Sequence, residues 1–561
     1  MDGARLGTGL SPRAREGQGY DSPMKVARGM AGAGPLPLAL LALVGCSDSE
    51  DGGGVTPDPA AHKRNLILIA VDTLRADHLG CYGSDIATPH MDALAAAGAR
   101  FSSARAHIPL TGPSHASLFT SSLPSDHGCT VNSQSFPEAN HTLAEILSEQ
   151  GWATAAFISL GVLSDRFGFA QGFDTYGGTF IRRWWKSAEE VNARFTKWLR
   201  LERPEAPLFV FLHYSDPHSP YAPPGREYPL IEVRRGKEVL ARVPADSREH
   251  DVRVQLPDRR EDFEFVLPAG VGAGDVGCWM IRTDDRAVSV KFAQDEEFLQ
   301  SIRGRPGFKN LPRAFRLINL QKTTKEVALQ ITLREQLTPE RRVSLYREEV
   351  VYVDTQIGLA IEALRGAGLW ENSVVVFTAD HGEGLGQHGL VGHVDQLYDS
   401  LLRVPLIVVA PGLVQPGTVI DAPVGHVDVL PTLLDLLGIS VSDRFRGVSL
   451  LPWLEGASAT NSPPVLGETH LPEAKSNQRS IVQWGFKYIL HQADGSEELY
   501  DLTRDPGEEH DLASSMPDKL KDLATLLQRE FEREFGPGVS GEGQDLSDED
   551  KANLRGIGYA R

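Results

Sequence analysis

Cysteine and positive charge are both scarce in this chain. Its 561 residues include four cysteines, and no two of them have the spacing of a paired metal-binding motif, so neither a disulfide framework nor a zinc ribbon is indicated. Lys and Arg number 56 against 75 Asp and Glu, which gives a formal net charge of −19. A chain with this balance repels nucleic acid, and we expect no nucleic-acid partner.

An apolar run near the N-terminus is too short to span a membrane. It covers residues 35–45, about half of the roughly 20 residues that a transmembrane helix needs. Lys25 and Arg28 precede it and Cys46 follows it, which is the pattern of a secretory signal. The last four letters, Leu-Val-Gly-Cys, resemble the bacterial lipobox, in which the cysteine is lipidated and becomes the mature N-terminus. A fortuitous apolar leader is the alternative.

This interpretation divides the N-terminal region into two parts. Residues 1–45 would be an over-extended start, with Met24 as the better initiator, followed by the lipoprotein signal peptide. Residues 46–64 would be a flexible tether. We therefore expect a lipoprotein of the bacterial cell envelope, periplasmic or tethered to the outer membrane, whose membrane contact is a lipid on Cys46. The sequence leaves the oligomeric state open.

The most informative stretch is Val374 to Glu383, Val-Val-Val-Phe-Thr-Ala-Asp-His-Gly-Glu. Four apolar residues predict a buried strand, which delivers Asp380 and His381 to the carboxyl end of a sheet, where open α/β folds bind their ligands. An acid beside an imidazole is typical of a metal site, but the same three letters, Asp-His-Gly, also occur in plain turns. The pair needs partners elsewhere in the chain.

The run from Asn65 to Asp72 supplies the first partner. Asn-Leu-Ile-Leu-Ile-Ala-Val-Asp predicts a central parallel strand that ends in a carboxylate. The following letters, Val-Asp-Thr-Leu-Arg-Ala-Asp-His-Leu-Gly-Cys-Tyr-Gly, resemble the opening motif of the sulfatase family. Many sulfatases have two adjacent carboxylates here, whereas this chain has Asp72 followed by Thr73. One hard oxygen ligand is missing, which weakens the case for calcium.

The second partner is Thr111. The family's nucleophile signature, Cys or Ser, any residue, Pro, any residue, Arg, falls in register on residues 111–115, Thr-Gly-Pro-Ser-His. Pro113 would be the first residue of a helix, whose free N–H groups face an anion at Thr111. The threonine could instead be a plain N-cap. His115 stands in place of the signature arginine, and we include it among the catalytic candidates.

Thr111 changes the chemistry that the resemblance implies. Sulfatases oxidise the Cys or Ser to formylglycine, and the β-methyl group of threonine forbids that aldehyde. A Thr111 nucleophile would form a direct ester that water clears, as phosphatases, phosphodiesterases and phosphoethanolamine transferases of the wider alkaline phosphatase superfamily do. This favours hydrolysis of phosphate mono- or diesters, or phosphoryl transfer. An authentic sulfatase is the alternative, and a non-catalytic, lipid-tethered binding protein is a third hypothesis.

Several histidines complete the predicted site. His218 lies in Asp-Pro-His-Ser-Pro-Tyr, a further family hallmark that implies contact with the anionic head or the leaving oxygen. His393 follows His381 by twelve residues, an interval at which phosphoethanolamine transferases place a histidine at the phosphate or at a second metal. We expect His213 to be a core residue, and Lys487 a surface lysine.

The resemblance predicts an α/β sandwich of the alkaline phosphatase and sulfatase type, with a large, mixed, mostly parallel central sheet between helices. The catalytic domain would comprise residues 65–228 and 339–460, interrupted by a β-rich insertion at 229–338 and followed by a C-terminal subdomain with a small antiparallel sheet and a tail, 461–561.

We predict that one divalent metal binds Asp72, Thr111, Asp380 and His381. Mixed nitrogen and oxygen ligands favour zinc or manganese, with calcium or magnesium also compatible, and a second metal is an option for His218 and His393. The substrate would be an anionic ester.

Overall fold

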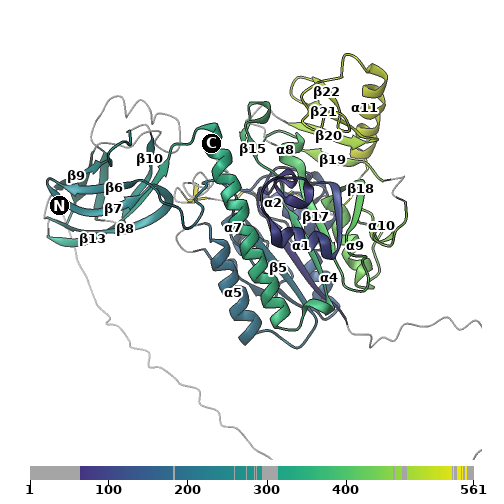
Figure 1. The fold of residues 1–561 in the computed structure, drawn as a ribbon, viewed down its shortest axis with the longest axis horizontal. Helices are drawn as coiled ribbons and strands as arrows, with labels where there is room; N and C mark the ends of the chain where they lie inside the picture. Colours follow the sequence, from purple (N-terminus) through teal and green to yellow (C-terminus); the bar gives the residue numbers. More distant parts are fainter. Residues whose placement is uncertain are drawn as a thin grey trace, which may run out of the picture. The chain divides into compact units, whose positions relative to one another are not determined.

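The computed structural model describes residues 63–551 with the exception of 181–183, 258–259, 273–274, 284, 286, 293–313, 322, 394, 459–461, 471–476, 534, 536–537, 539, 545 and 548–549 (Figure 1). The lipidation prediction at Cys46 lies outside these residues. Among the described residues no helix combines the length and the apolar character that crossing a membrane requires.

A mixed eight-stranded sheet forms the centre of the catalytic domain. Its strand order is β18-β2-β17-β14-β1-β5-β3-β4, and all pairs are parallel except the two that involve β17. The strands are β1 (Asn65–Val71), β2 (Ala99–Arg105), β3 (Ala153–Phe157), β4 (Thr175–Tyr176), β5 (Leu208–Tyr214), β14 (Ser373–Ala379), β17 (Arg403–Val409) and β18 (Thr418–Gly425). This confirms the predicted fold class.

The central strands are mostly apolar and are buried along their whole length because helices cover both faces of the sheet. Every residue of β1, β5 and β14 is buried. In one set of helices, α7 (Pro339–Gly366) contacts both α1 (Pro89–Ala97) and α5 (Ala188–Leu201) (Figure 1). In a second set, α2 (Thr111–Thr120) contacts both α4 (Leu143–Glu149) and α9 (Val429–Leu436).

Two smaller β units have cores of their own. Strands β6 to β13 form two antiparallel sheets around a separate apolar cluster that includes Phe263, Phe315 and Leu329. Their bounds are β6 (Leu230–Arg235), β7 (Glu238–Pro244), β8 (Asp246–Leu256), β9 (Arg260–Val266), β10 (Val276–Thr283), β11 (Val288–Phe292), β12 (Ala314–Asn319) and β13 (Lys325–Glu335).

The C-terminal unit is a four-stranded antiparallel sheet against one helix. It consists of β19 (Val465–Glu468), β20 (Gln478–Gln483), β21 (Phe486–His491), β22 (Glu497–Asp501) and α11 (Pro517–Phe531). Its core includes Ile481, Tyr488 and Leu523.

Candidate active site

Three neighbouring strands end together at the site. In the parallel register Val71 pairs with Ala379 on one side and with Tyr214 on the other. Asp72 therefore emerges beside Asp380, and the loop that follows β5 emerges on the other side of Asp72. The carboxyl edge of β14-β1-β5 is thus the place where acids far apart in sequence meet.

Backbone groups fix the direction of Asp380. Its Oδ1 accepts hydrogen bonds from the N–H groups of Thr73 at 3.1 Å and His381 at 2.8 Å. Next to them, Gly382 donates to the carbonyl of Leu401 at 2.7 Å, and a Cβ at this position would lie 2.3 Å from the carbonyl oxygen of Ser400. The glycine of Asp-His-Gly is therefore required by close packing of the loop.

The predicted metal ligands form one buried cluster. One ligand atom from each of Asp72, Asp380 and His381 lies within 4.8 Å of the other two. The Nε2 of His381 is 3.5 Å from Oδ2 of Asp380 and 4.0 Å from Oδ1 of Asp72. All three residues are at most 1% exposed.

These residues fit a divalent metal. Nδ1 of His381 lies 2.9 Å from the carbonyl of Gly382, which leaves Nε2 facing the carboxylates, and within the described part of the chain this Nε2 has no hydrogen-bond partner. Thr73 stands where many sulfatases have a second carboxylate, and its hydroxyl donates to the carbonyl of Asp72 at 2.7 Å. The donor set therefore contains both nitrogen and oxygen.

Thr111 points its hydroxyl into this cluster. It is the first residue of α2, and its Oγ1 donates to Oδ2 of Asp72 at 3.0 Å. Leu110 is the N-cap residue, so the plain N-cap interpretation of Thr111 is wrong. The expectation for Pro113 is also wrong, because the helix begins two residues earlier.

The two carboxyl groups have opposite pKa shifts. Burial alone would raise the pKa of Asp72, but His218, His213 and His381 outweigh burial and hold this pKa well below its usual value. Burial, together with the negative charge of Asp72, raises the pKa of Asp380 well above its usual value. Two buried acids this close cannot both ionise cheaply without a cation between them. The cluster therefore has the electrostatics of a cation site.

His115 and His213 lie beside the acids. Nδ1 of His115 is 2.7 Å from the carbonyl of Thr111, one helical turn earlier, and 3.8 Å from Oδ2 of Asp380. His213 is fully buried, pairs with the hydroxyl of Ser159 at 2.8 Å and places Nε2 3.7 Å from Asp72. His115, His213 and Asp380 also form a group of ligand atoms within 4.8 Å, so His213 is more than a remote core residue.

His218 and His393 flank the cluster. Their ring centroids are 5.0 Å apart, and the ring of His393 is 4.5 Å from that of His381. Nδ1 of His218 lies 2.5 Å from the carbonyl of Ser219, and Nδ1 of His393 lies 3.3 Å from Glu383. Neither histidine belongs to a three-ligand group of this kind among the described residues.

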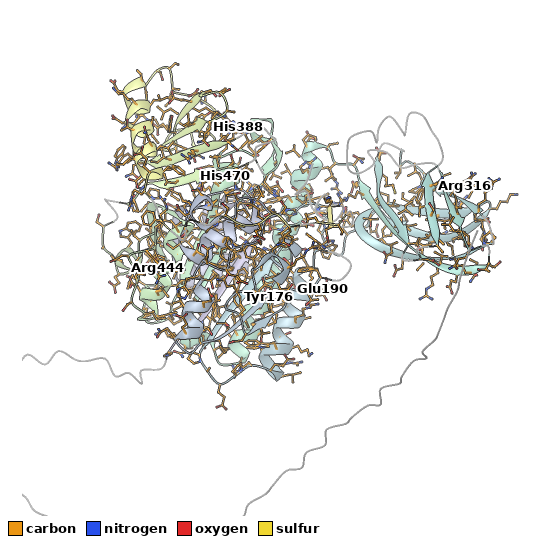
Figure 2. All side chains as sticks on the ribbon, turned by 180° about the vertical axis from the view of Figure 1, so that it is seen from behind. Tyr176, Glu190, Arg316, His388, Arg444 and His470 are labelled. Atoms are coloured by element: carbon orange, nitrogen blue, oxygen red, sulfur yellow. The ribbon has the colours of Figure 1, made fainter. Side chains whose placement is uncertain are left out.

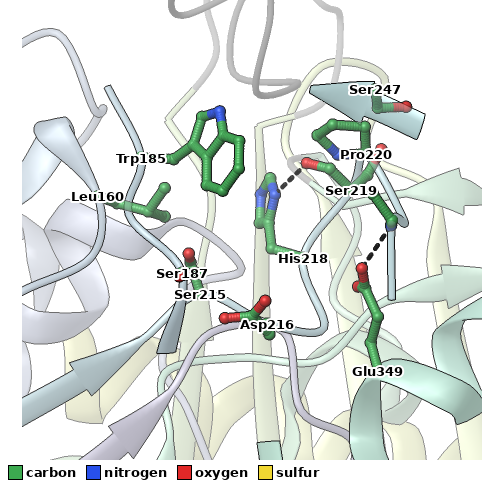
Figure 3. A pocket seen from close by; sticks show the side chains of 11 residues that line it. Leu160, Trp185, Ser187, Ser215, Asp216, His218, Ser219, Pro220, Ser247 and Glu349 are labelled. Atoms are coloured by element: carbon green, nitrogen blue, oxygen red, sulfur yellow. Dashed lines mark hydrogen bonds between the residues drawn. The ribbon is translucent and has the colours of Figure 1, made fainter. Parts of the chain in front are cut away.

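A hollow borders His218. Its walls include Trp185, Ser187, Asp216 and Glu349, and Figure 3 shows the indole of Trp185 beside the imidazole of His218. The Oε1 of Glu349 holds this loop by accepting a hydrogen bond from the N–H of Ala222 at 2.5 Å.

His388 and Lys487 both contact the C-terminal part of the chain. His388 stacks on Tyr398 with ring centroids 3.8 Å apart, and its Nε2 lies 3.0 Å from the carbonyl of Gly507, so it contacts the C-terminal segment instead of the metal cluster (Figure 2). The surface prediction for Lys487 is wrong, since its side chain is fully buried between Asp399 at 2.9 Å and Glu508 at 2.7 Å.

Sequence reasoning gave no role to Glu383 and Tyr221. Glu383 is fully buried, and its Oε2 accepts a hydrogen bond from the hydroxyl of Tyr221 at 3.1 Å. Both residues stand in motifs that drew attention to other residues. Glu383 closes the Asp-His-Gly-Glu motif of Asp380 and His381, and Tyr221 closes the Asp-Pro-His-Ser-Pro-Tyr motif of His218. Their proximity to the predicted histidines in sequence was the available signal.

Two family profiles match this chain, and both describe sulfatases. The family profile described as Sulfatase matches residues 64–439, about two thirds of the chain, and the profile for the C-terminal part of N-sulphoglucosamine sulphohydrolase matches residues 386–534. The chain belongs to the sulfatase family. It is a sulfatase-like hydrolase that acts on ester bonds, as expected from the sequence.

Individual relatives of this sulfatase-family chain span most of its length. An N-acetylglucosamine-6-O-sulfatase of Bacteroides thetaiotaomicron is 25% identical over 531 residues, which are 88% of this chain and 89% of the relative.

Two solved structures share the fold. One is a protein solved in complex with its substrate D-glucosamine-2-N,6-O-disulfate, with a TM-score of 0.58 and 20% identity; the match covers 84% of this chain and 98% of that chain. The other is the phosphonate monoester hydrolase of Agrobacterium radiobacter, with a TM-score of 0.57 and 19% identity; the match covers 84% of this chain and 96% of that chain.

Proposed function

We propose that this protein is a metal-dependent hydrolase of sulfate esters that uses Thr111 directly as its nucleophile. The observation that carries the proposal is the Thr111 hydroxyl, bonded to Asp72 at the mouth of the buried Asp72, Asp380 and His381 cluster. The sequence alone favoured phosphate esters. The names of the relatives give more support to sulfate esters, so we place sulfate first.

Asp72, Asp380, His381 and the oxygen of Thr111 would hold the metal. When bound, a divalent ion lowers the pKa of a coordinated hydroxyl and offsets negative charge on the attacked group. We propose zinc or manganese, because the donor set mixes a ring nitrogen with carboxylate oxygens. The calcium preferred by oxygen-only sites fits less well.

The chain's own residues would carry out two displacements. In the first, Thr111 Oγ attacks sulfur, the bond from sulfur to the ester oxygen breaks, and the alcohol departs with a proton, leaving a sulfate ester on Thr111. In the second, water attacks the same sulfur and releases sulfate and the free hydroxyl. Asp72 orients the Thr111 hydroxyl, and His218 and His393 contact the sulfuryl oxygens and the departing alcohol.

Phosphate and phosphonate esters are the second candidate substrates. The β-methyl group of Thr111 excludes the formylglycine route, and a direct ester on a hydroxyl nucleophile is common in phosphoryl transfer. One of the solved structures with this fold is a phosphonate monoester hydrolase. Both candidates use the same nucleophile and the same ligand set.

The substrate's location and the N-terminal anchor form a further part of the proposal. We propose that the substrate is an anionic ester outside the cytoplasm and that the protein is tethered to the cell envelope through Cys46, as the N-terminal pattern predicts. Mass spectrometry of the protein recovered from membranes tests the lipid on Cys46, and a Cys46→Ala variant is the control.

Turnover tests the proposed function. Metal-loaded protein is assayed with nitrophenyl sulfate, nitrophenyl phosphate and bis-nitrophenyl phosphate. We expect the highest kcat/KM with the sulfate ester. A higher value for either phosphate would reverse the order of the two candidates, and no turnover of any ester by metal-loaded protein would contradict the proposal.

A further inference from the structure

A third buried carboxylate stands next to the site without belonging to the metal cluster. Glu383 is fully buried and contributes to neither three-ligand group among the described residues. Its three acceptor positions are all engaged: the backbone carbonyl accepts from Arg75 at 3.2 Å, Oε2 accepts from Tyr221 at 3.1 Å, and Oε1 lies 3.3 Å from Nδ1 of His393.

These contacts join the two segments that carry the flanking histidines. Tyr221 lies three residues after His218 in the loop that follows β5. His393 directly follows β16 (Val391–Gly392), which pairs with β15 (Gly384–Leu385) in a short hairpin. A single carboxylate therefore connects the His218 loop to the hairpin of His393.

The contact also sets the direction of the His393 ring. A carboxylate only accepts hydrogen bonds, so Nδ1 of His393 must be the protonated donor toward Glu383. Nε2 is then the ring atom on the side away from Glu383. The ring centroids of His381 and His218 lie 4.5 Å and 5.0 Å from that of His393, so the His393 ring is close to both of these histidines.

We propose that Glu383 is a positioning residue that holds Nδ1–H of His393 and thereby presents Nε2 to the ester undergoing cleavage. This inference rests on the proposed function for the identity of the ester, but the ring geometry does not depend on it. Tyr221 keeps the carboxylate in place and couples it to the loop of His218. A buried carboxylate behind a histidine is a recurrent device for fixing the tautomer and ring orientation.

Two substitutions of Glu383 distinguish the effect of its charge from the effect of its hydrogen bonds. Glu383→Gln keeps the size of the side chain, but its amide has one acceptor oxygen in place of two and carries no charge, so it holds Nδ1–H of His393 less firmly. Glu383→Leu removes both contacts. We expect kcat to fall about 10- to 100-fold in Glu383→Gln with KM changed less than about threefold, and to fall further in Glu383→Leu.

The chain offers a matched control. Glu468 is equally buried, accepts from the N–H of Ser125 at 2.7 Å and pairs with His470 at 2.9 Å in the C-terminal unit. Glu468→Gln should leave kcat within about twofold of wild type. Equal loss in the Glu468 and Glu383 variants would show a general packing effect and overturn the proposal.

A double-mutant cycle with His393→Ala isolates the coupling. If Glu383 acts through His393, Glu383→Gln should cost less than about threefold in the His393→Ala background, because the two effects are not additive. Additive losses would overturn the proposal. Wild-type turnover that is lost in Thr111→Ala but unchanged in Glu383→Gln would overturn this inference alone and leave the proposed function standing.

A readout without turnover completes the test. Histidine-selective ¹⁵N NMR of the full-length protein, with His393 assigned from the His393→Ala spectrum, should show a protonated Nδ1 in wild type and a mixture of tautomers in Glu383→Leu. A wild-type His393 protonated only at Nε2 would overturn the proposal even if no ester were turned over.

Discussion

Thr111 and Asp72 are joined by a hydrogen bond of 3.0 Å from Oγ1 to Oδ2, although 39 residues separate them in the chain. Asp72 follows the central strand β1, and Thr111 opens helix α2. A hydroxyl oriented by a buried carboxylate, beside a second carboxylate and an imidazole, is the arrangement that a metal-assisted nucleophile requires.

Removing the hydroxyl should therefore remove activity. Thr111→Val keeps the β-branched shape of the side chain, so the fold should be preserved while kcat falls at least about 10³-fold, as expected for loss of a nucleophile. Thr111→Ser retains a hydroxyl and should keep measurable turnover. Initial rates on the best ester, with circular dichroism as the folding check, decide the matter. Full activity in Thr111→Val would rule out this nucleophile.

Asp380→Asn should preserve the stability of the metal-free protein but weaken metal binding. The amide can still accept the backbone hydrogen bonds at Oδ1 but carries no charge, so repulsion from Asp72 disappears and the metal-free protein should be at least as stable as wild type. The variant should bind less than about a tenth as much metal at equal free concentration.

Melting curves with and without added zinc or manganese, together with elemental analysis, check the behaviour of Asp380→Asn. A stoichiometric metal content in the variant would count against Asp380 as a ligand.

Much of this site could be predicted from the sequence because its residues follow apolar strands. The buried runs before Asp72 and Asp380 define two parallel strands, and parallel strands bring their carboxyl ends to one edge. The helical start at Thr111 was placed to within two residues. The residues whose positions are set by strand geometry could therefore be predicted from the sequence.

Other positions depend on packing between segments that the sequence does not reveal as neighbours. Lys487 carries no local sign of burial, since its partner Asp399 lies 88 residues earlier in the chain. His388 lies only five residues before His393 in the chain, but a stacked contact with Tyr398 and a contact with the carbonyl of Gly507 place it against the C-terminal segment. Glu383 is held in part by Tyr221, which lies 162 residues away in the chain.

Lys487 should be essential for stability. It joins a buried ion cluster in which Asp399 also pairs with Arg105 at 2.6 Å. Lys487→Met leaves the carboxylate of Glu508 buried without its cation, and we expect a loss of about 3–5 kcal/mol in the free energy of unfolding. Lys521 is an exposed lysine of α11, and Lys521→Met should change the free energy of unfolding by less than about 0.5 kcal/mol. Urea unfolding of both variants makes the comparison, and equal effects would contradict the role of the cluster.

Stability should fall as the pH is lowered from about 6.5 to about 4. His107 is buried in neutral form, with Nδ1 2.6 Å from the carbonyl of Leu466 and Nε2 accepting from the N–H of Val427 at 3.1 Å. Burial lowers the pKa of His107 to about 4. Between these pH values the unfolded chain binds the proton and the folded chain does not, so protonation favours unfolding.

His107→Gln tests the source of this pH dependence. The glutamine carbonyl can replace Nε2 as the acceptor for Val427 but does not titrate, so the decrease between pH 6.5 and 4 should be shallower by up to about 1.4 kcal/mol per pH unit. Other buried histidines, His127 and His426, keep part of the slope because burial lowers the pKa of each to about 3. Denaturant unfolding at several pH values gives the slopes, and identical slopes in wild type and variant would exclude His107 as a contributor.

The central claim is that Thr111 becomes esterified during turnover, and rapid acid quench followed by peptide mass spectrometry tests it most directly. Metal-loaded protein mixed with nitrophenyl sulfate, and in parallel with nitrophenyl phosphate, should yield a peptide that carries the sulfuryl or phosphoryl group on Thr111, and the adduct should be absent in Thr111→Val. Turnover with an unmodified Thr111 peptide at every quench time, or with the group on another residue, would contradict the account.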